Sequence, residues 1–120
     1  MTPVDRPGEQ PPVPQPAVLT VLTTLDSAGA AAELARLLVE ARLAACAQVS
    51  GPVTSVYRWK GLTETTQEWQ VLFKTTAERY PALEDRLLAA HPYDTPEVIA
   101  TPVVRGSAGY LAWVAEEVAP

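Results

Sequence analysis

The sequence is poor in the residues that most often carry out chemistry. Its 120 residues include one cysteine, Cys46, and one histidine, His91. A single cysteine cannot form a disulfide within the chain, so nothing indicates a disulfide-stabilised secreted scaffold. The phosphate-binding P-loop, the dinucleotide-binding glycine motif, the Cys-x-x-Cys pair and the His-Glu-x-x-His zinc motif are all absent. We therefore expect a protein that is not an enzyme.

Positive charge and long apolar runs are also scarce. Nine Lys and Arg stand against 14 Asp and Glu, which gives a net charge of -5. Such a surface does not attract phosphate backbones or anionic lipid, so we expect neither a nucleic-acid nor a membrane partner. No apolar run reaches the roughly 18 residues of a membrane span, and residues 1–15 lack the features of a signal peptide. We expect a cytoplasmic protein.

Proline is concentrated at the N-terminal end, where six of the 12 prolines fall within the first 16 residues. Proline has no amide hydrogen and fixes φ, which disfavours helices and strand ladders. We predict that residues 1–16 form a disordered tail and that residues 17–120 form the folded domain. A second interpretation of the tail, as a ligand for a proline-recognising domain, stays open.

Apolar periodicity in residues 17–120 predicts a β-α-β-β-α-β order followed by one more helix. The predicted strands are 17–25, 46–59, 63–75 and 98–104. The first predicted helix is capped by Asp26 or Ser27 and ends at about 42–44, the second runs from 78 to 90, and the third follows Ser107. This order is typical of the ferredoxin-like α+β fold, a four-stranded antiparallel sheet with both main helices on one face.

Two features of this fold predict contact with another copy of the chain. The strands on either side of Lys60-Gly61 are longer than the five or six residues usual in a small domain. The sheet face opposite the helices is left uncovered. We expect Trp59, Trp69 and Phe73 to lie on that face or at its edges, where another subunit would bury them.

Six short motifs then occur in a fixed order. They are Leu43-Ala44-Ala45-Cys46, Tyr57-Arg58-Trp59-Lys60-Gly61, Glu68-Trp69-Gln70, Lys74-Thr75-Thr76, His91-Pro92-Tyr93-Asp94-Thr95-Pro96-Glu97 and Tyr110-Leu111-Ala112-Trp113. Across residues 18–118, this ordered set resembles the divalent-cation tolerance family, CutA.

The resemblance implies a homotrimer of ferredoxin-like subunits that responds to metal ions, with no established catalytic reaction and no organic cofactor. It also implies tolerance of copper and other divalent cations, and copper binding in some members. Those copper-binding members carry a cysteine in the first strand and two adjacent histidines before Pro-Tyr. This chain has Thr23 at the first position and Ala90-His91 at the second.

Two candidate sites follow. His91 and Glu97 are candidate ligands for copper or another divalent cation, although a histidine at a helix end also serves as a cap. A second set, Tyr57, Trp59, Lys74, Tyr93 and Trp113, is a candidate inter-subunit cleft for a small anion or metabolite. The leading function is weak metal binding by a homotrimer, and the alternative is a trimeric small-molecule sensor or adaptor. A structural scaffold is a third interpretation.

Deletion of residues 1–16 is expected to leave the melting temperature nearly unchanged, because a proline-rich tail contributes little to a packed core. Thermal unfolding of the full chain and of the truncated chain, at equal protein concentration, measures this directly. A large fall in the melting temperature would show instead that the tail packs on the folded domain.

Overall fold

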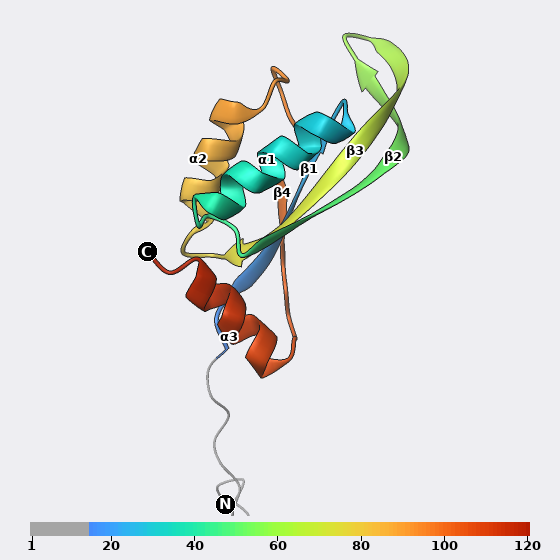
Figure 1. Ribbon diagram of the computed structural model, residues 1–120. Helices are drawn as coiled ribbons and strands as arrows, with labels where there is room; N and C mark the ends of the chain where they lie inside the picture. The colour runs from blue at the N-terminus through green and yellow to red at the C-terminus, as the bar shows by residue number, and fades with distance from the viewer. Residues whose placement is uncertain (1–14) are drawn as a thin grey trace, which may run out of the picture.

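The computed structural model describes residues 15–120, and the larger part of the predicted tail, residues 1–14, lies outside the described residues. The elements are β1 (Val18–Leu25), α1 (Ala28–Glu40), β2 (Cys46–Trp59), β3 (Leu62–Thr76), α2 (Tyr80–Ala90), β4 (Ile99–Pro102) and α3 (Ala108–Glu117). The strands form one antiparallel sheet in the order β2-β3-β1-β4. Helices α1 and α2 cover one face, and α3 lies at one end (Figure 1). The predicted α+β architecture is confirmed.

The main core lies between the sheet and the helices α1 and α2. Val21 of β1 pairs with Phe73 of β3, and both side chains are fully buried. Trp69, four residues before Phe73 on the same side of β3, packs against this core. The prediction that Trp69 and Phe73 lie on the uncovered face or at an edge is therefore wrong for these two. Trp59 remains 44% exposed on the hairpin.

Helix α1 begins where the sequence predicts. Ser27 is its N-cap, and the Ser27 Oγ accepts a hydrogen bond of 3.0 Å from the backbone N–H of Ala30. The helix ends at Glu40, slightly before the predicted end, because Arg42 adopts a positive φ of 60°. Leu34 and Leu38 face the core, as their helical spacing predicts.

Helix α2 and strand β4 are shorter than predicted. Residues 77–79 form a turn, closed by a 3.1 Å bond from Arg79 N–H to the Thr76 carbonyl, so α2 starts at Tyr80. Pro81 lies in its first turn, where no helical amide is needed. Strand β4 ends at Pro102, and a 2.9 Å hydrogen bond from the Val103 N–H to the Val18 carbonyl holds the next residue against β1. Within residues 15–120, none of the helices has the length and hydrophobicity required to span a membrane.

Helix α3 is held at the end of the sheet by a second, smaller core. Leu111, Val114 and Val118 pack with Val18 of β1. Arg42 donates hydrogen bonds of 3.0 and 3.1 Å to the carbonyls of Glu117 and Glu116, which satisfy acceptors at the helix C-terminus.

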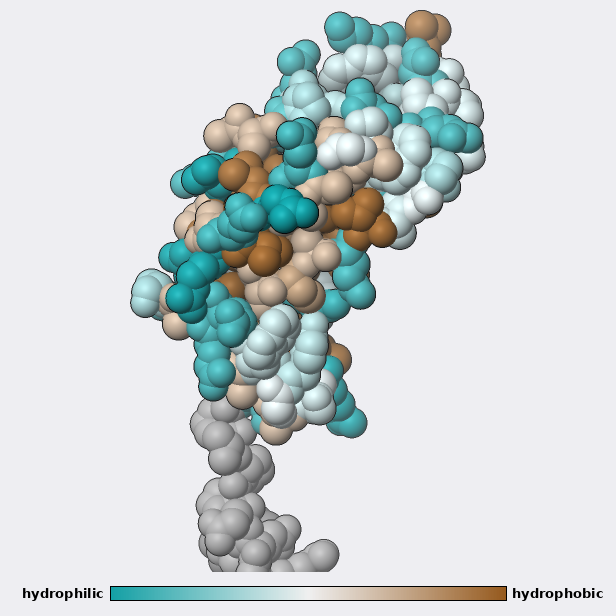
Figure 2. Space-filling view, viewed as in Figure 1, coloured by the Kyte–Doolittle hydropathy of each residue, from teal (hydrophilic) through white to brown (hydrophobic). Residues whose placement is uncertain are grey.

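Figure 2 shows the side of the molecule that α1 and α2 cover, where apolar patches lie between hydrophilic side chains.

The β2–β3 hairpin extends beyond the helices (Figure 1). Its two-residue turn places Lys60 and Gly61 at φ of 51° and 81°, values that suit the twist of a hairpin. The pairing register shifts between Ser50 and Val53, which marks a β-bulge at residues 51–52. Gly51 in this bulge has a φ of 144°, and a Cβ built there would lie 2.9 Å from Trp69 Cδ1.

The substitution Gly51→Ala is expected to lower the free energy of unfolding by about 2 kcal/mol, because it combines a strained φ with a clash against Trp69. Gly29→Ala is the matched control, since Gly29 lies in the first turn of α1 and a Cβ added there would meet open space. Urea unfolding at one protein concentration compares the two variants. An equal effect of both substitutions would contradict the assigned role of the bulge.

Candidate functional site

The only histidine lies at a corner where the ends of α2 and β1 meet. His91 caps α2 and is buried. Its Nε2 lies 2.8 Å from the Thr24 carbonyl oxygen, and its Nδ1 accepts a 3.1 Å hydrogen bond from the Tyr93 backbone N–H. A carbonyl only accepts, so Nε2 carries the proton and the ring is neutral. Both ring nitrogens are therefore engaged, and a metal would have to displace one partner.

Burial lowers the pKa of His91 below its ordinary value. The hydrogen bond to the Thr24 carbonyl and the charges of Asp26 and Glu68 act in the opposite direction and only partly offset this effect. A proton on Nδ1 would also face the Tyr93 N–H, and two donors cannot bond to each other. The folded state thus favours the neutral ring.

Tyr93 connects this corner to the sheet face that α1 and α2 do not cover. Its ring packs edge-on against His91, with 4.7 Å between ring centroids. Its hydroxyl donates a 2.9 Å hydrogen bond to Glu68 Oε2. Burial, this bond and the negative charge of Glu68 raise the pKa of Tyr93. The tyrosine therefore remains a hydrogen-bond donor throughout the physiological pH range.

A cavity of about 550 Å³ opens on the same sheet face. The strand register places Ser55, Tyr57 and Trp59 of β2 on the side of the sheet to which Glu68 of β3 points. The loop after α2 closes the cavity from the β1 side. The lining residues are Thr24, Ser55, Val56, Tyr57, Trp59, Glu68, Tyr93, Asp94, Thr95 and Glu97. Aromatic rings and carboxylates thus share one cavity.

Only one of the two predicted metal ligands lines this cavity. Glu97 lines the cavity, whereas His91 is buried behind Tyr93 and is not among the lining residues. Among residues 15–120, no three His, Cys, Asp or Glu side chains come close enough together to hold a metal ion. The assignment of His91 and Glu97 as metal ligands stays a prediction.

The predicted cleft residues divide into two groups within one protomer. Tyr57, Trp59 and Tyr93 line the cavity together. Lys74 bonds Gln48 Oε1 at 2.8 Å, and its Nζ lies 5.9 Å from the centroid of the Tyr110 ring.

Trp113 belongs to this second group, because its ring lies 5.5 Å from that of Tyr110. The half-buried Cys46 is there too, with its Sγ 3.5 Å from the Tyr110 hydroxyl. That contact and burial raise the pKa of Tyr110 to about 12. The shared inter-subunit cleft stays a prediction.

Sequence analysis did not identify two carboxylates of the cavity, Glu68 and Asp94. Glu68 alternates with Trp69 on β3, so it points away from the core, yet it is only 9% exposed. Period-2 alternation put Glu68 on the opposite face from Trp69 without telling which face that is, and only the contact with Tyr93 shows what covers Glu68.

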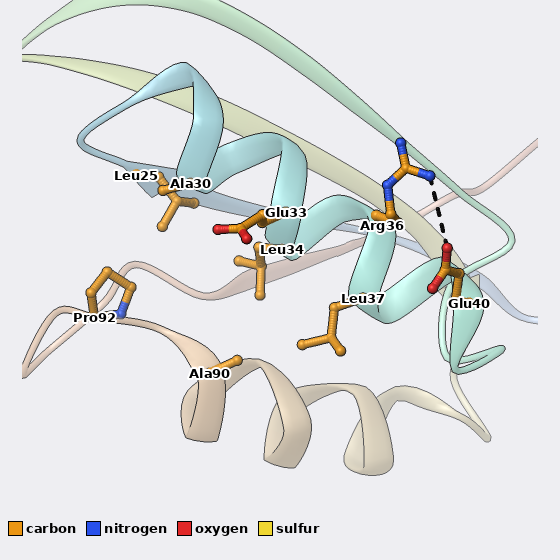
Figure 3. A pocket seen from close by; sticks show the side chains of 9 residues that line it. All are labelled: Leu25, Ala30, Glu33, Leu34, Arg36, Leu37, Glu40, Ala90 and Pro92. Carbon is orange, nitrogen blue, oxygen red and sulfur yellow. Dashed lines mark ion pairs between the residues drawn. The ribbon is translucent and has the colours of Figure 1, made fainter.

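A second hollow lies between α1 and α2 (Figure 3). Its floor is apolar, formed by Leu25, Leu34 and Leu37 of β1 and α1, with Pro92 at the far wall. Its charged rim residues include Arg36 and Glu40, which pair with each other at 3.8 Å. This hollow offers an apolar surface and no convergent polar groups, so the cavity on the sheet face is the better candidate site.

Comparison with known proteins gives consistent matches over most of the chain. Residues 19–117 match the family described as CutA1 divalent ion tolerance protein. The divalent-cation tolerance protein CutA of Thermus thermophilus is 44% identical over 96 residues, which cover 80% of this chain and 93% of that protein.

Solved structures agree with these sequence matches. The crystal structure of CutA from Xylella fastidiosa has a TM-score of 0.82 at 42% identity and covers 84% of this chain and 97% of that one. A CutA structure from Archaeoglobus fulgidus, described as periplasmic, has a TM-score of 0.81 at 33% identity and covers 84% and 98%.

Acid is expected to destabilise the fold through His91. Because the folded state lowers the pKa of His91, the neutral ring supports stability above its unfolded pKa of about 6.5, and this support is lost as pH falls below that value. The single imidazole can be titrated by NMR, and its pKa should lie below 6.5. The melting temperature of the His91→Gln variant should change less between pH 7.5 and pH 5 than that of the unmodified chain. A pKa above the ordinary value would contradict the neutral ring.

Proposed function

This chain belongs to the CutA1 divalent ion tolerance family, and we propose that it is a homotrimeric metal-response protein that binds copper or other divalent cations weakly. The observation that carries the metal assignment is the position of the only imidazole. His91 lies where the charges of Asp26 and Glu68 both act on it. A corner that combines an imidazole with negative charge attracts divalent cations even when its ligands are few.

The homotrimer is supported by the part of the sheet face that all three helices leave uncovered in the described part of the chain. Leu22 and Leu72 pair on this face and are half-buried, and the neighbouring Ile99 is 55% exposed. Apolar side chains also remain exposed on the hairpin and on α3, namely Tyr57, Trp59, Leu62, Tyr110 and Trp113. Burial of these surfaces against further copies accounts for both the uncovered face and the long hairpin.

Weak binding follows from the ligands that this chain offers. Thr23 is buried in β1, one residue before the Thr24 carbonyl that accepts from His91. Ala90 is the last residue of α2. The two positions that carry a thiolate and a second imidazole in copper-binding members thus adjoin His91 along β1 and α2, but here neither supplies a ligand atom. A site with one imidazole and the Glu97 carboxylate falls short of the three or four ligands of a tight transition-metal site.

The cytoplasm is the proposed location, and the single unpaired Cys46 suits a reducing compartment. A second candidate function, a trimeric small-molecule sensor or adaptor, is favoured by the cavity of about 550 Å³ on the uncovered face.

Calorimetric titration with Cu(II) tests the metal proposal. We expect about one ion per subunit with a Kd weaker than about 10 μM, as befits an incomplete ligand set. His91→Gln and Glu97→Gln should each weaken binding by at least about fivefold, because each removes one of two ligands. Glu33→Gln is the matched control, since Glu33 is an exposed carboxylate at the hollow between α1 and α2.

A second experiment restores the metal ligands that this chain lacks. The double substitution Thr23→Cys with Ala90→His should tighten Cu(II) binding by more than about tenfold if the corner is a metal site with too few ligands. Binding that is absent, or unchanged by all four substitutions, would contradict the metal proposal.

A further inference from the structure

The hollow between α1 and α2 is an apolar surface that stays open in the proposed homotrimer. It lies on the helix side of the sheet, opposite the sheet face that further copies cover (Figure 1, Figure 3). Apolar patches are visible on this side of the molecule in Figure 2. The volume of the hollow is about 550 Å³. Because apolar surface is unfavourable in water, a partner that covers this hollow gains free energy from its burial.

Helix α1 presents a second apolar stripe to the hollow, beside the stripe that faces the core. The core-facing residues of α1 are Ala31, Leu34, Ala35 and Leu38. Ala30 and Leu37 lie two turns apart on the adjoining side of the helix and are half-buried (Figure 3). One stripe is enough to hold a helix on a sheet, so the second stripe can pack against a further element. The small side chains of Ala30 and of Ala90 on α2 let that element approach both helices closely.

The lining of the hollow favours a helix over an extended segment as its occupant. The backbone groups of α1 and α2 bond within their own helices, so an extended segment in the hollow would find no backbone partners there. A helix satisfies its own backbone and needs only an apolar face. Grooves that bind proline-rich segments are lined by aromatic rings, and none of the described lining residues of this hollow is aromatic. An amphipathic helix is therefore the occupant that fits.

The charges at the rim decide which amphipathic helix fits. Arg36 is the one basic residue in the described lining, and its pair with Glu40 at 3.8 Å offsets both charges. Glu33 is exposed and has no ion-pair partner among residues 15–120. Asp26, which follows the lining residue Leu25, adds a second exposed carboxylate at that end. The same hollow of a second copy would bring like charges together, whereas a basic helix brings opposite ones.

We propose that the hollow between α1 and α2 is a docking site for a basic amphipathic helix of another protein. Apolar side chains of that helix, at positions i, i+3 or i+4, and i+7, pack over Leu34 and Leu37. A lysine or arginine beside this apolar face pairs with Glu33 at the rim. The docking site goes beyond the divalent-cation function proposed above and uses neither of its two candidate ligands.

A synthetic helix of about 18 residues tests the proposal on the full-length protein. The probe peptide carries leucine at positions i, i+3 or i+4, and i+7, and lysine on its other face. Fluorescence anisotropy should give a Kd below about 100 μM for this probe. A peptide of the same composition, reordered to have no apolar stripe, should bind at least about tenfold more weakly. A peptide with glutamate in place of lysine should bind at least about fivefold more weakly. Absence of binding, or equal binding of the probe and the reordered peptide, would overturn the proposal.

Two pairs of matched variants locate the site. Ala90→Phe fills the hollow and should weaken probe binding by at least about tenfold, whereas Ala89→Phe adds the same ring outside the lining and should leave binding unchanged. Glu33→Gln should weaken probe binding by at least about threefold, and Glu78→Gln, which removes an equal charge outside the hollow, should not. All four positions are exposed, so the fold tolerates each change. Equal effects within both pairs would overturn the assignment.

Two other occupants of the hollow predict different results. Deletion of residues 1–14 should leave probe binding unchanged, and binding that appears only after this deletion would assign the hollow to the N-terminal segment of the chain. Sedimentation should show no assembly heavier than the trimer. A heavier assembly that dissociates with Ala90→Phe but not with Ala89→Phe would assign the hollow to a second copy. Either of these two results would overturn the proposal.

Discussion

The two-residue alternation along β3 decides which of its side chains enter the core and which reach the other face of the sheet. Trp69, Val71 and Phe73 point toward α1 and α2 and form the floor of the core. Glu68 and Lys74 point to the other face. A shift of one residue in the pairing of β3 would put the carboxylate and the ammonium into the core and the aromatic rings into water. The same alternation therefore places the apolar side chains of β3 in the core and its carboxylate and ammonium groups on the uncovered face.

The loop after α2 joins the two faces of the sheet through hydrogen bonds of His91 and Tyr93. His91 bonds the Thr24 carbonyl behind the cavity, and Tyr93 bonds Glu68 at the cavity wall. The Tyr93 backbone also donates to His91, so the two anchors share one short segment. Two hydrogen bonds thus link His91 to the Glu68 carboxylate through Tyr93.

Sequence patterns predicted which helices and strands form more accurately than which side chains contact each other. The bounds of β2 were predicted correctly because Lys60-Gly61 marks the turn, and Ser27 marked the start of α1. Alternation separated the side chains of β3 into two sets but could not tell which set faces the helices. Phe73 was therefore predicted on the wrong face of the sheet. Tyr93 was predicted for the site, whereas Glu68 was not. Their contact joins residues 25 positions apart and depends on the path of the loop, which no local pattern encodes.

We propose that further copies of the chain cover the sheet face that α1 and α2 leave open, in a homotrimer. Sedimentation equilibrium of the full-length protein over a range of concentrations tests this most directly, because it gives the assembly mass without reference to shape. A homotrimer sediments as a single species with three times the 12.9 kDa mass of the chain. A stable monomer at micromolar concentration would contradict it, because the apolar face and the long hairpin would then remain in water.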